Sequence, residues 1–259
     1  MAAQNPHMTF AFLSSGTDQA DHSARVLSAR YGDVAPEDAD VVVALGGDGF
    51  MLQTIQQFMN TGTPIYGMNR GTVGFLMNEF SEEDLPARVA AAQTEQIRPL
   101  KMRAVDIGGK ETVALAINEV SLFRQSYQAA RLKIDVDEKT RLDDLVCDGV
   151  MVATPAGSTA YNLSAQGPII PLDAPLLALT PVSPFRPRRW RGALLPNHVR
   201  VTISILEAEK RPVNAVADHT EVKSVLQVDI WESREDIGTV LFDASHSWDE
   251  RILNEQFKY

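Results

Sequence analysis

The strongest constraint on the fold is an unbroken apolar run, DVVVAL at residues 40–45, that leads directly into Gly46-Gly47-Asp48-Gly49. A β-branched run without polar alternation is typical of a strand buried on both faces of a parallel sheet. The first hundred residues alternate between such strands and segments with helical spacing. We expect strands at 9–13, 40–45 and 63–68, and helices at 18–31, 50–59 and 82–93. This alternation predicts an α/β domain with a Rossmann-like parallel sheet.

The pattern changes near residue 100 to short strands separated by turn residues. Gly108-Gly109 and Asp137-Glu138 are typical of hairpin turns. We therefore expect a β-rich second domain at 101–242, after an α/β domain at 1–100, and a tail at 243–259 that packs back on the first domain. The expected strands lie at 102–107, 112–123, 131–136, 149–154, 199–206, 213–217, 222–231 and 239–242.

Composition restricts the kinds of partner. The formal net charge is −10, which disfavours nonspecific binding to nucleic acid or anionic membranes. No apolar run is long enough to span a bilayer, and the single cysteine, Cys147, fits a reducing compartment, so we expect a cytoplasmic protein. The one dense basic run, 186–191, fits a solvated loop or a subunit contact, with a phosphate-binding patch as the alternative.

The glycine-rich segment is the first candidate site. Ligands of open α/β sheets bind at the carboxyl ends of the strands, where glycines let a phosphate approach the backbone and a helix N-terminus offers N–H groups. The Asp48 carboxylate would repel a phosphate unless it takes a proton from an attacking hydroxyl or holds a metal ion. A tight turn in which Asp48 caps the helix is the alternative.

The second candidate is the segment TPAGSTAYNLS at residues 154–164, directly after the expected strand 149–154. Pro155 and Gly157 predict a turn, and Ser158 is a suitable N-cap for the helix that follows. Several hydroxyls converge there, which suits a ribose or a phosphate better than an apolar ligand. A capped helix start is the alternative, although one cap needs only one hydroxyl.

Two polar pairs complete the candidates. Asn118-Glu119 interrupts an apolar strand, and buried polar groups need partners that a ligand can provide. An exposed edge or a bulge would explain the same pair. Cys147-Asp148 precedes the strand at 149, and Asp148 would lie at its entrance or serve as a turn residue. Cys147 has no nearby histidine, so we do not expect a catalytic thiol.

Absent motifs narrow the function further. The chain lacks the P-loop GxxxxGK[ST], the Rossmann G-x-G-x-x-G, the protein-kinase signatures, HExxH and paired CxxC. The segment around Ser158 is not a G-x-S-x-G elbow. Among five scattered histidines only His219, beside Asp218, is worth attention, and a structural role is the simpler interpretation.

Together these residues resemble the NAD kinase family over most of the chain. The glycine-aspartate loop is shared with lipid kinases and phosphofructokinases, whereas the TPxGSTAYxxSAxGP stretch is specific. The matching motifs are Gly46 to Gly49, Asn69-Arg70-Gly71 with Gly74-Phe75-Leu76, Asn118-Glu119, Asp148-Gly149, and Thr154 to Pro168.

The resemblance implies an α/β domain and a C-terminal β-sandwich with NAD bound between them, often in a homotetramer. It implies a kinase that transfers the γ-phosphoryl group of ATP, with Mg²⁺, to the 2′-hydroxyl of the adenosine ribose of NAD, giving NADP. Polyphosphate is an alternative donor. A lipid or sugar kinase and a noncatalytic dinucleotide sensor are the competing functions.

The same resemblance assigns residues. Asp48 is the expected general base, and no metal ligand is assigned. Phosphate contacts are expected at Gly46, Gly47 and Gly49. The expected NAD contacts are Asp48, Gly49, Phe75, Asn118, Glu119, Val146, Asp148, Ser158, Thr159, Ala160, Tyr161, Asn162, Leu163 and Ser164. The chain departs from the family pattern at Val146, Ala156, Gln166 and His219, where relatives commonly have a basic residue, Thr, Gly and Gly.

Overall fold

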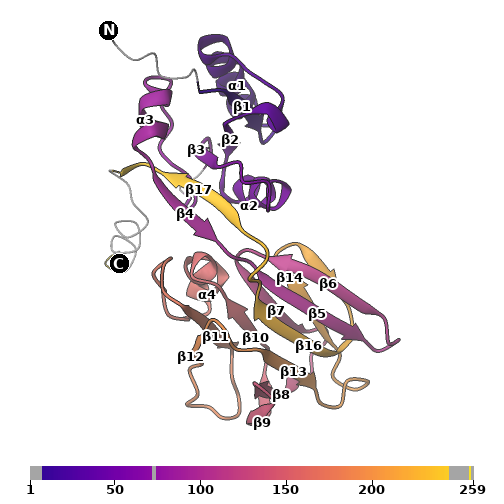
Figure 1. Ribbon diagram of the computed structural model, residues 1–259. Helices are drawn as coiled ribbons and strands as arrows, with labels where there is room; N and C mark the ends of the chain where they lie inside the picture. Colours follow the sequence, from indigo (N-terminus) through magenta and orange to yellow (C-terminus); the bar gives the residue numbers. More distant parts are fainter. Residues whose placement is uncertain (1–7, 72–73, 245–256, 258–259) are drawn as a thin grey trace. The chain divides into compact units, whose positions relative to one another are not determined.

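The computed structural model describes residues 8–71, 74–244 and 257. The chain divides into two compact units, one formed by Met1–Ile97 with Asp236–Tyr259 and the other by Arg98–Glu235 (Figure 1). The helices within the described ranges are all too short or too polar to cross a membrane.

The first unit has a five-stranded sheet of order β1-β2-β3-β17-β4. Strands β1, β2 and β3 are parallel to one another, β17 pairs parallel with β3, and β4 is antiparallel at the edge. This confirms the predicted Rossmann-like α/β architecture. The elements are β1 (Phe10–Ser14), α1 (Asp18–Tyr31), η1 (Pro36–Asp38), β2 (Val41–Gly46), α2 (Asp48–Gln57), β3 (Ile65–Asn69), α3 (Leu85–Ala91), β4 (Gln93–Ile97) and β17 (Gly238–Phe242).

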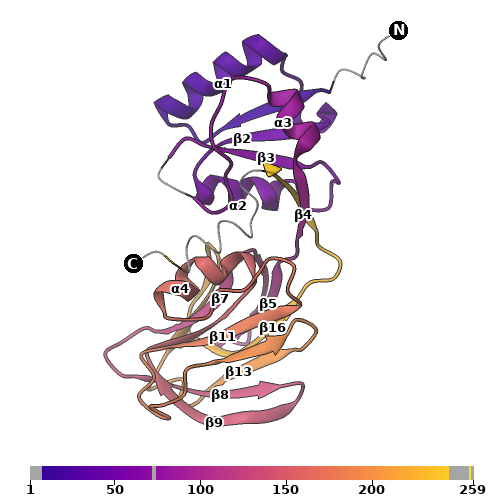
Figure 2. The same cartoon turned by 90° about the vertical axis from the view of Figure 1, so that its left-hand side faces the viewer.

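Burial on both faces of the sheet explains why the run at 40–45 is almost continuously apolar. All six residues of β2 are buried, since helices cover both faces of the sheet: α1 lies on one face and α2 on the other (Figure 2). Helix α1 begins where the Thr17 side chain accepts a hydrogen bond from the Ala20 N–H at 3.3 Å. Its Leu27 joins the buried core of β1, β2 and β3.

Strand β17 corrects the expected domain assignment. The sequence placed 239–242 in the β-rich domain, but Gly238–Phe242 pairs with β3 and β4 in the first unit (Figure 1). The side chain of Asp243, just beyond it, accepts a hydrogen bond from the Tyr66 hydroxyl and pairs with Arg88, each at 2.5 Å. The sequence of a short apolar strand does not show which sheet it joins. The pairing depends on which strand edge is available in the folded protein.

The second unit is a sandwich of two six-stranded sheets, as the resemblance implied. One sheet has the order β12-β11-β10-β7-β14-β15 and the other β6-β5-β16-β13-β8-β9, with antiparallel neighbours throughout. Apolar side chains from both sheets form one core. The strands are β5 (Leu100–Asp106), β6 (Glu111–Ala116), β7 (Glu119–Arg124), β8 (Ala130–Val136), β9 (Lys139–Cys147), β10 (Gly149–Ala153), β11 (Leu176–Val182), β12 (Ala193–Pro196), β13 (Val201–Ile205), β14 (Val213–Ala217), β15 (Thr220–Val222) and β16 (Val225–Glu232).

The structure differs from the expected strands in three ways. The strand expected at 222–231 is interrupted after Val222, the end of β15, and resumes at Val225 as β16. The single strand expected at 112–123 is broken at Ile117-Asn118, where the chain leaves the β6 sheet and enters the β7 sheet. The polar or proline-containing strands β4, β9, β11 and β12 were not expected, because their apolar alternation is weak. Both predicted hairpin turns are present, with positive φ at Gly109, Asp137 and Glu138. The tail expected to pack at 243–259 lies outside the described residues, apart from 243, 244 and 257.

Candidate active site

The glycine-aspartate loop lies at the carboxyl ends of the parallel strands. Gly46 is the last residue of β2, Gly47 is the N-cap of α2, and Asp48 is its first residue. A Cβ on Gly46 would lie 2.9 Å from the Cβ atoms of both Ser15 and Phe50, so this position has no room for a side chain. Gly47 and Gly49 have open space around them, which leaves this backbone accessible to a ligand.

The Asp48 carboxylate is held by a second loop. Oδ2 accepts a hydrogen bond from the Phe75 N–H at 2.7 Å, and Oδ1 accepts one from the Leu76 N–H at 3.0 Å. The alternative in which Asp48 caps its own helix is therefore wrong, since no side-chain cap is formed at the start of α2. A carboxylate has about four acceptor positions, so two remain for a substrate hydroxyl.

Gly74 explains how the carboxylate reaches these N–H groups. A Cβ on Gly74 would lie 2.3 Å from Asp48 Oδ1 and 2.8 Å from its Cγ. Any side chain there would occupy the position of the carboxylate. The motif Gly74-Phe75-Leu76 thus orients Asp48, with two backbone donors and a gap where a side chain would be.

In the second unit, Asn118 and Glu119 lie where the chain crosses between sheets. The half-buried side chain of Asp218 accepts hydrogen bonds from the N–H groups of Ile117 and Asn118 at 2.7 and 3.0 Å. Thr154 donates from its N–H to the Asn118 carbonyl at 2.9 Å and from its hydroxyl to the Ile117 carbonyl at 2.6 Å. These contacts fix the backbone of the pair without using either of its side chains.

Glu119 is electrostatically unusual. Burial, and to a lesser extent the nearby negative charge of Asp218, together raise the pKa of Glu119 to about 7. Burial also raises the pKa of Asp218, which backbone hydrogen bonds and His219 oppose. Glu119 Oε2 is buried and has no hydrogen-bond partner among the described residues. A protonated carboxyl or a ligand hydroxyl would satisfy this oxygen.

This environment predicts a pH-dependent stability. The unfolded chain loses the Glu119 proton near its ordinary pKa of 4.5, whereas the native protein keeps it up to about 7. Stability should therefore decrease as pH rises through this interval and stay low above it. At pH 8, Glu119→Gln should be more stable than the wild type by about 1–3 kcal/mol, and the gain should shrink towards pH 5.

Thermal denaturation of both proteins between pH 5 and 8 measures this difference. Glu138→Gln, on an exposed hairpin turn, removes the same charge and serves as the control. A constant difference between Glu119→Gln and the wild type across this range would contradict a titrating Glu119.

The hydroxyl-rich segment uses most of its side chains internally. Thr154–Thr159 are buried, with η2 at Ala156–Thr159 and α4 at Tyr161–Ser164. The Ser158 hydroxyl bonds the Pro155 carbonyl at 2.7 Å and the Ile170 N–H at 2.9 Å. The Asn162 amide donates to the carbonyls of Ser158 and Pro168 and accepts from the Thr180 hydroxyl at 2.6 Å. Ser158 and Asn162 thus stabilise the turn from within, and their side chains are not open to a ligand.

Tyr161 and Ser164 are the exposed residues of this segment. Tyr161 is 42% exposed and packs its ring 5.6 Å from that of Phe123. Together with Asp148 it lines an open hollow of about 550 Å³, and Arg124 pairs with Asp148 at 2.5 Å. The structure thus brings Asp148 and Tyr161 together. The full lining is Phe123, Arg124, Gln125, Ser126, Tyr127, Asp148, Tyr161 and Val182.

Val146 and Cys147 are the last two residues of strand β9. Val146 accepts a hydrogen bond from the Phe185 N–H at 2.7 Å and donates one to the Arg186 carbonyl at 2.9 Å, so its backbone anchors the arginine-rich loop. Burial raises the pKa of the Cys147 thiol to about 12. A thiol with this pKa stays protonated and is a poor nucleophile at neutral pH.

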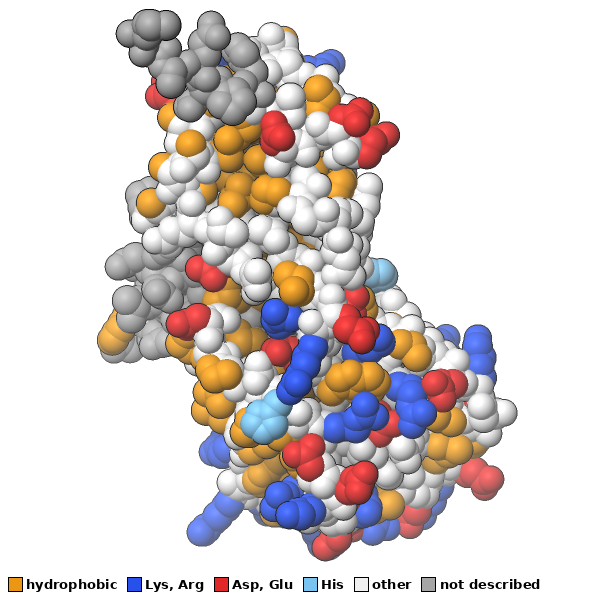
Figure 3. Space-filling model, in the orientation of Figure 1, with side chains coloured by type: hydrophobic (Ala, Val, Ile, Leu, Met, Phe, Trp, Pro, Cys, Tyr) orange, Lys and Arg blue, Asp and Glu red, His pale blue; other side chains and the backbone are white. Residues whose placement is uncertain are grey.

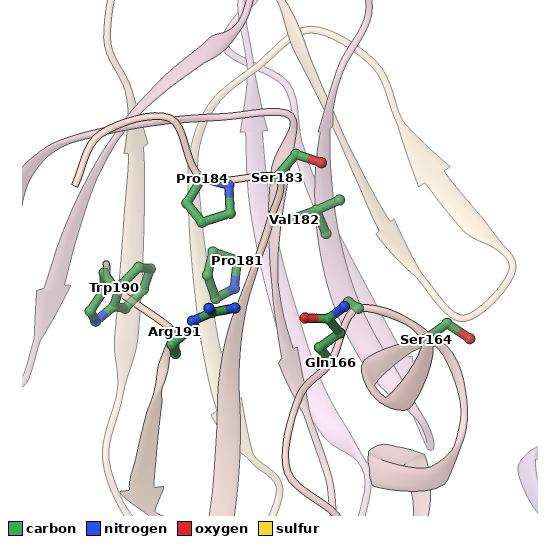
Figure 4. A pocket seen from close by; sticks show the side chains of 9 residues that line it. Ser164, Gln166, Pro181, Val182, Ser183, Pro184, Trp190 and Arg191 are labelled. Carbon is green, nitrogen blue, oxygen red and sulfur yellow. The ribbon is translucent and has the colours of Figure 1, made fainter. Parts of the chain in front are cut away.

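A second, smaller hollow of about 280 Å³ adjoins the first at Val182 (Figure 4). Ser164 lies on its α4 side, beside Gln166, and Trp190 and Arg191 lie on the opposite side. Gln166 has φ +64°, a left-handed conformation that glycine adopts more readily than other residues. The remaining arginines of the run 186–191 are exposed, and Arg186 and Arg188 lie over the Phe185 ring.

The structure adds residues that sequence reasoning missed. Arg124 contacts Asp148, Asp218 holds the Asn118 backbone, and Thr180 completes the Asn162 network. Position 157 also requires glycine, because a Cβ there would lie 2.0 Å from the Asn118 carbonyl oxygen. The Thr-Pro-x-Gly pattern could have suggested this contact, but Arg124 and Thr180 lie in unremarkable strand sequence.

Two family models match the two units. The model described as ATP-NAD kinase N-terminal domain matches residues 7–96, and the ATP-NAD kinase C-terminal domain matches 117–241. NAD kinase of Brucella suis is 68% identical over 248 residues, covering 96% of each chain. NAD kinase of Rhizobium meliloti is 65% identical over 249 residues, covering 96% of this chain and 97% of that one.

Solved structures agree at the level of the fold. Yeast NADH kinase complexed with NADH has a TM-score of 0.82 at 22% identity, covering 97% of this chain and 88% of that chain. An NAD kinase from Archaeoglobus fulgidus in complex with ATP has a TM-score of 0.74 at 23% identity, with coverages of 92% and 95%. The carboxylate oriented by the Gly74 loop, the crossing at Asn118 and these full-length matches lead to one conclusion: the chain belongs to the NAD kinase family.

Proposed function

We propose that this kinase transfers the γ-phosphoryl group of ATP to the 2′-hydroxyl of the adenosine ribose of NAD, with Asp48 as the general base. The observation that carries the proposal is the Asp48 carboxylate at the carboxyl end of β2, held by the N–H groups of Phe75 and Leu76. A protein that only binds a dinucleotide gains nothing from a carboxylate placed where phosphates bind.

The chemistry required of the chain is modest. Phosphoryl transfer mainly needs an in-line nucleophile and neutralisation of the charge on the moving group. Asp48 would accept the hydroxyl proton as the new phosphate ester forms. Gly47 and Gly49, with open space above them, would let the phosphates approach the backbone at the start of α2.

The NAD-binding role falls to the second unit. Tyr161 offers an exposed ring for stacking, and Asp148 offers a carboxylate in the same hollow. The Asn118 amide can donate to and accept from a purine edge, and Glu119 can bond a ribose hydroxyl through its unpartnered oxygen. Thr159, Ala160, Leu163 and Ser164 would contribute backbone or exposed surface, while Ser158 and Asn162 act by shaping the turn.

We expect Mg²⁺ to bind together with the triphosphate, through its phosphate oxygens and water. Within the described ranges no group of three His, Cys, Asp or Glu side chains could hold a metal ion. Mg²⁺ commonly keeps several waters and binds through substrate phosphates, so it needs no protein cage. When bound, it would neutralise charge on the phosphates, and the residues of the chain position the nucleophile and its base.

One assay tests the proposed reaction. The purified chain with Mg²⁺ and NAD should form NADP from ATP, and a parallel sample with polyphosphate identifies the donor. Consumption of ATP with diacylglycerol or fructose 6-phosphate, but not with NAD, would establish a lipid or sugar kinase instead. NAD binding without turnover would establish a dinucleotide sensor. The strong identity to curated NAD kinases over nearly the whole chain favours NAD over these acceptors.

The proposal includes a cytoplasmic location and a homo-oligomer. A buried, unreactive Cys147 is compatible with a reducing compartment. Phe185 is 49% exposed beside the arginine-rich loop and offers an apolar contact for a second copy of the chain. Sedimentation analysis of the purified protein would measure the oligomeric state.

A further inference from the structure

Positive charge is scarce in the first unit. Residues 1–97 contain no lysine and only four arginines, Arg25, Arg30, Arg70 and Arg88, among many carboxylates. On the face shown in Figure 3, basic side chains gather on the second unit, and few appear on the first. A unit that binds a triphosphate beside an aspartate needs a compensating cation at that place.

Three of these arginines are committed elsewhere. Arg88 pairs with Asp243 at 2.5 Å, and Arg30 donates to the Glu82 carbonyl at 2.6 Å. Arg25 donates to the Asp21 carbonyl of its own helix at 3.3 Å. Arg70 differs, because it directly follows Asn69, the last residue of β3, which pairs in register with Gly46 at the end of β2.

The Arg70 side chain is fixed at two points. Its Nε donates to the Ser23 hydroxyl at 2.6 Å, and its guanidinium carbon lies 3.5 Å from the centre of the Phe80 ring. Its backbone N–H donates to the Gly46 carbonyl at 2.7 Å, which ties it to the glycine-aspartate loop. Among the described residues no carboxylate forms an ion pair with it, so its terminal nitrogens remain as donors.

We propose that Arg70 is a phosphate-binding residue for the nucleoside triphosphate donor. A guanidinium held by its Nε and by a ring keeps two parallel N–H donors in a fixed direction, which matches the oxygens of a phosphate. The Arg70 backbone is joined to the glycine-aspartate loop by the hydrogen bond to the Gly46 carbonyl. The inference rests on the proposed ATP-dependent function and names the residue that neutralises the donor phosphates.

If Arg70 had a purely structural role, its guanidinium would be expected to complete a hydrogen-bond or ion-pair network within the first unit. The Ser23 hydroxyl donates to the Gln19 carbonyl at 2.8 Å and accepts a hydrogen bond from the Arg70 Nε. Phe80 packs against the core of the first unit and supplies only a ring face. These two contacts orient the side chain without neutralising its charge. An oriented, unneutralised cation on the residue that follows β3 and is bonded through its backbone to Gly46 indicates an anionic ligand.

The test compares Arg70→Gln with Arg25→Gln, which removes the same charge from α1. The KM for ATP of Arg70→Gln should rise about tenfold or more, as expected for lost charge-assisted hydrogen bonds, with the KM for NAD within about twofold of the wild type. Arg70→Lys should give an intermediate KM for ATP, because lysine keeps the charge and loses the fork. Titration calorimetry should show weaker binding of ATP and unchanged binding of adenosine.

An unchanged KM for ATP in folded Arg70→Gln would overturn the proposal, as would an equal rise in the KM for NAD. If Arg70→Gln does not fold, Ser23→Ala, which releases Nε and keeps the charge, should raise the KM for ATP about two- to fivefold. Wild-type KM for ATP in both Ser23→Ala and Arg70→Lys would then overturn it. NADP formation by the wild-type protein separates these results from failure of the proposed function itself.

Discussion

Asp48→Asn is expected to lower kcat for NADP formation by about 10²–10⁴-fold, the range for loss of a general base. The amide cannot take a proton from the ribose hydroxyl, whereas the remaining contacts to NAD are unaltered. Binding of NAD, measured by calorimetry, should change only a few-fold. Steady-state rates at saturating NAD and ATP measure the effect, and NADP formation at the wild-type rate would contradict the proposed role of Asp48 as the general base.

A second variant separates the position of the Asp48 carboxylate from its ability to accept a proton. Gly74→Ala keeps the carboxylate but would place a Cβ 2.3 Å from Asp48 Oδ1, so the carboxylate must leave its two N–H donors. We expect a large fall in kcat for this variant too. Gly71→Ala, whose Cβ would have its nearest neighbour at 3.8 Å, is the control in the same loop. Equal activity of these two alanine variants would show that the observed carboxylate position is unimportant.

Gly157→Ala is expected to destabilise the second unit by about 3 kcal/mol and to weaken NAD binding. The new Cβ would lie 2.0 Å from the Asn118 carbonyl oxygen and 2.5 Å from its Cα. Both are backbone atoms, so the η2 turn and the Asn118-Glu119 crossing must move apart. The same movement would disturb the hydrogen bonds of Thr154 that fix Asn118.

Thermal denaturation should show this as a decrease of about 6–12 °C in Tm, and the KM for NAD should increase in any enzyme that remains folded. Gly108→Ala is the control within this unit, because its Cβ would meet only the end of the Asp106 side chain, at 3.2 Å. A Tm equal to that of the control would show that the turn and the crossing are not tightly coupled.

Much of the fold could be predicted because its signals are local. The apolar run of β2 needs burial on both faces, whatever the rest of the chain does. The turns at Gly109 and Asp137-Glu138 need positive φ, which glycine and short polar residues adopt most readily. The sheet membership of β17 and the polar edge strand β4 could not be predicted, since pairing depends on which strand edge is free in the assembled unit.

The candidate site divides in the same way. Motif chemistry together with the family resemblance marked Asp48, Asn118-Glu119, Asp148 and the 154–164 turn, since a helix cap, a strand edge or a turn would also explain each motif taken by itself. Only the tertiary structure showed that the side chains of Ser158 and Asn162 bond within their own turn. It also showed that Arg70, held by Ser23, has no ion-pair partner among the described residues. The sequence determines which chemical groups are available. Their hydrogen-bond partners come from segments far apart in the chain, such as Thr180 for Asn162, so packing alone determines which groups remain free.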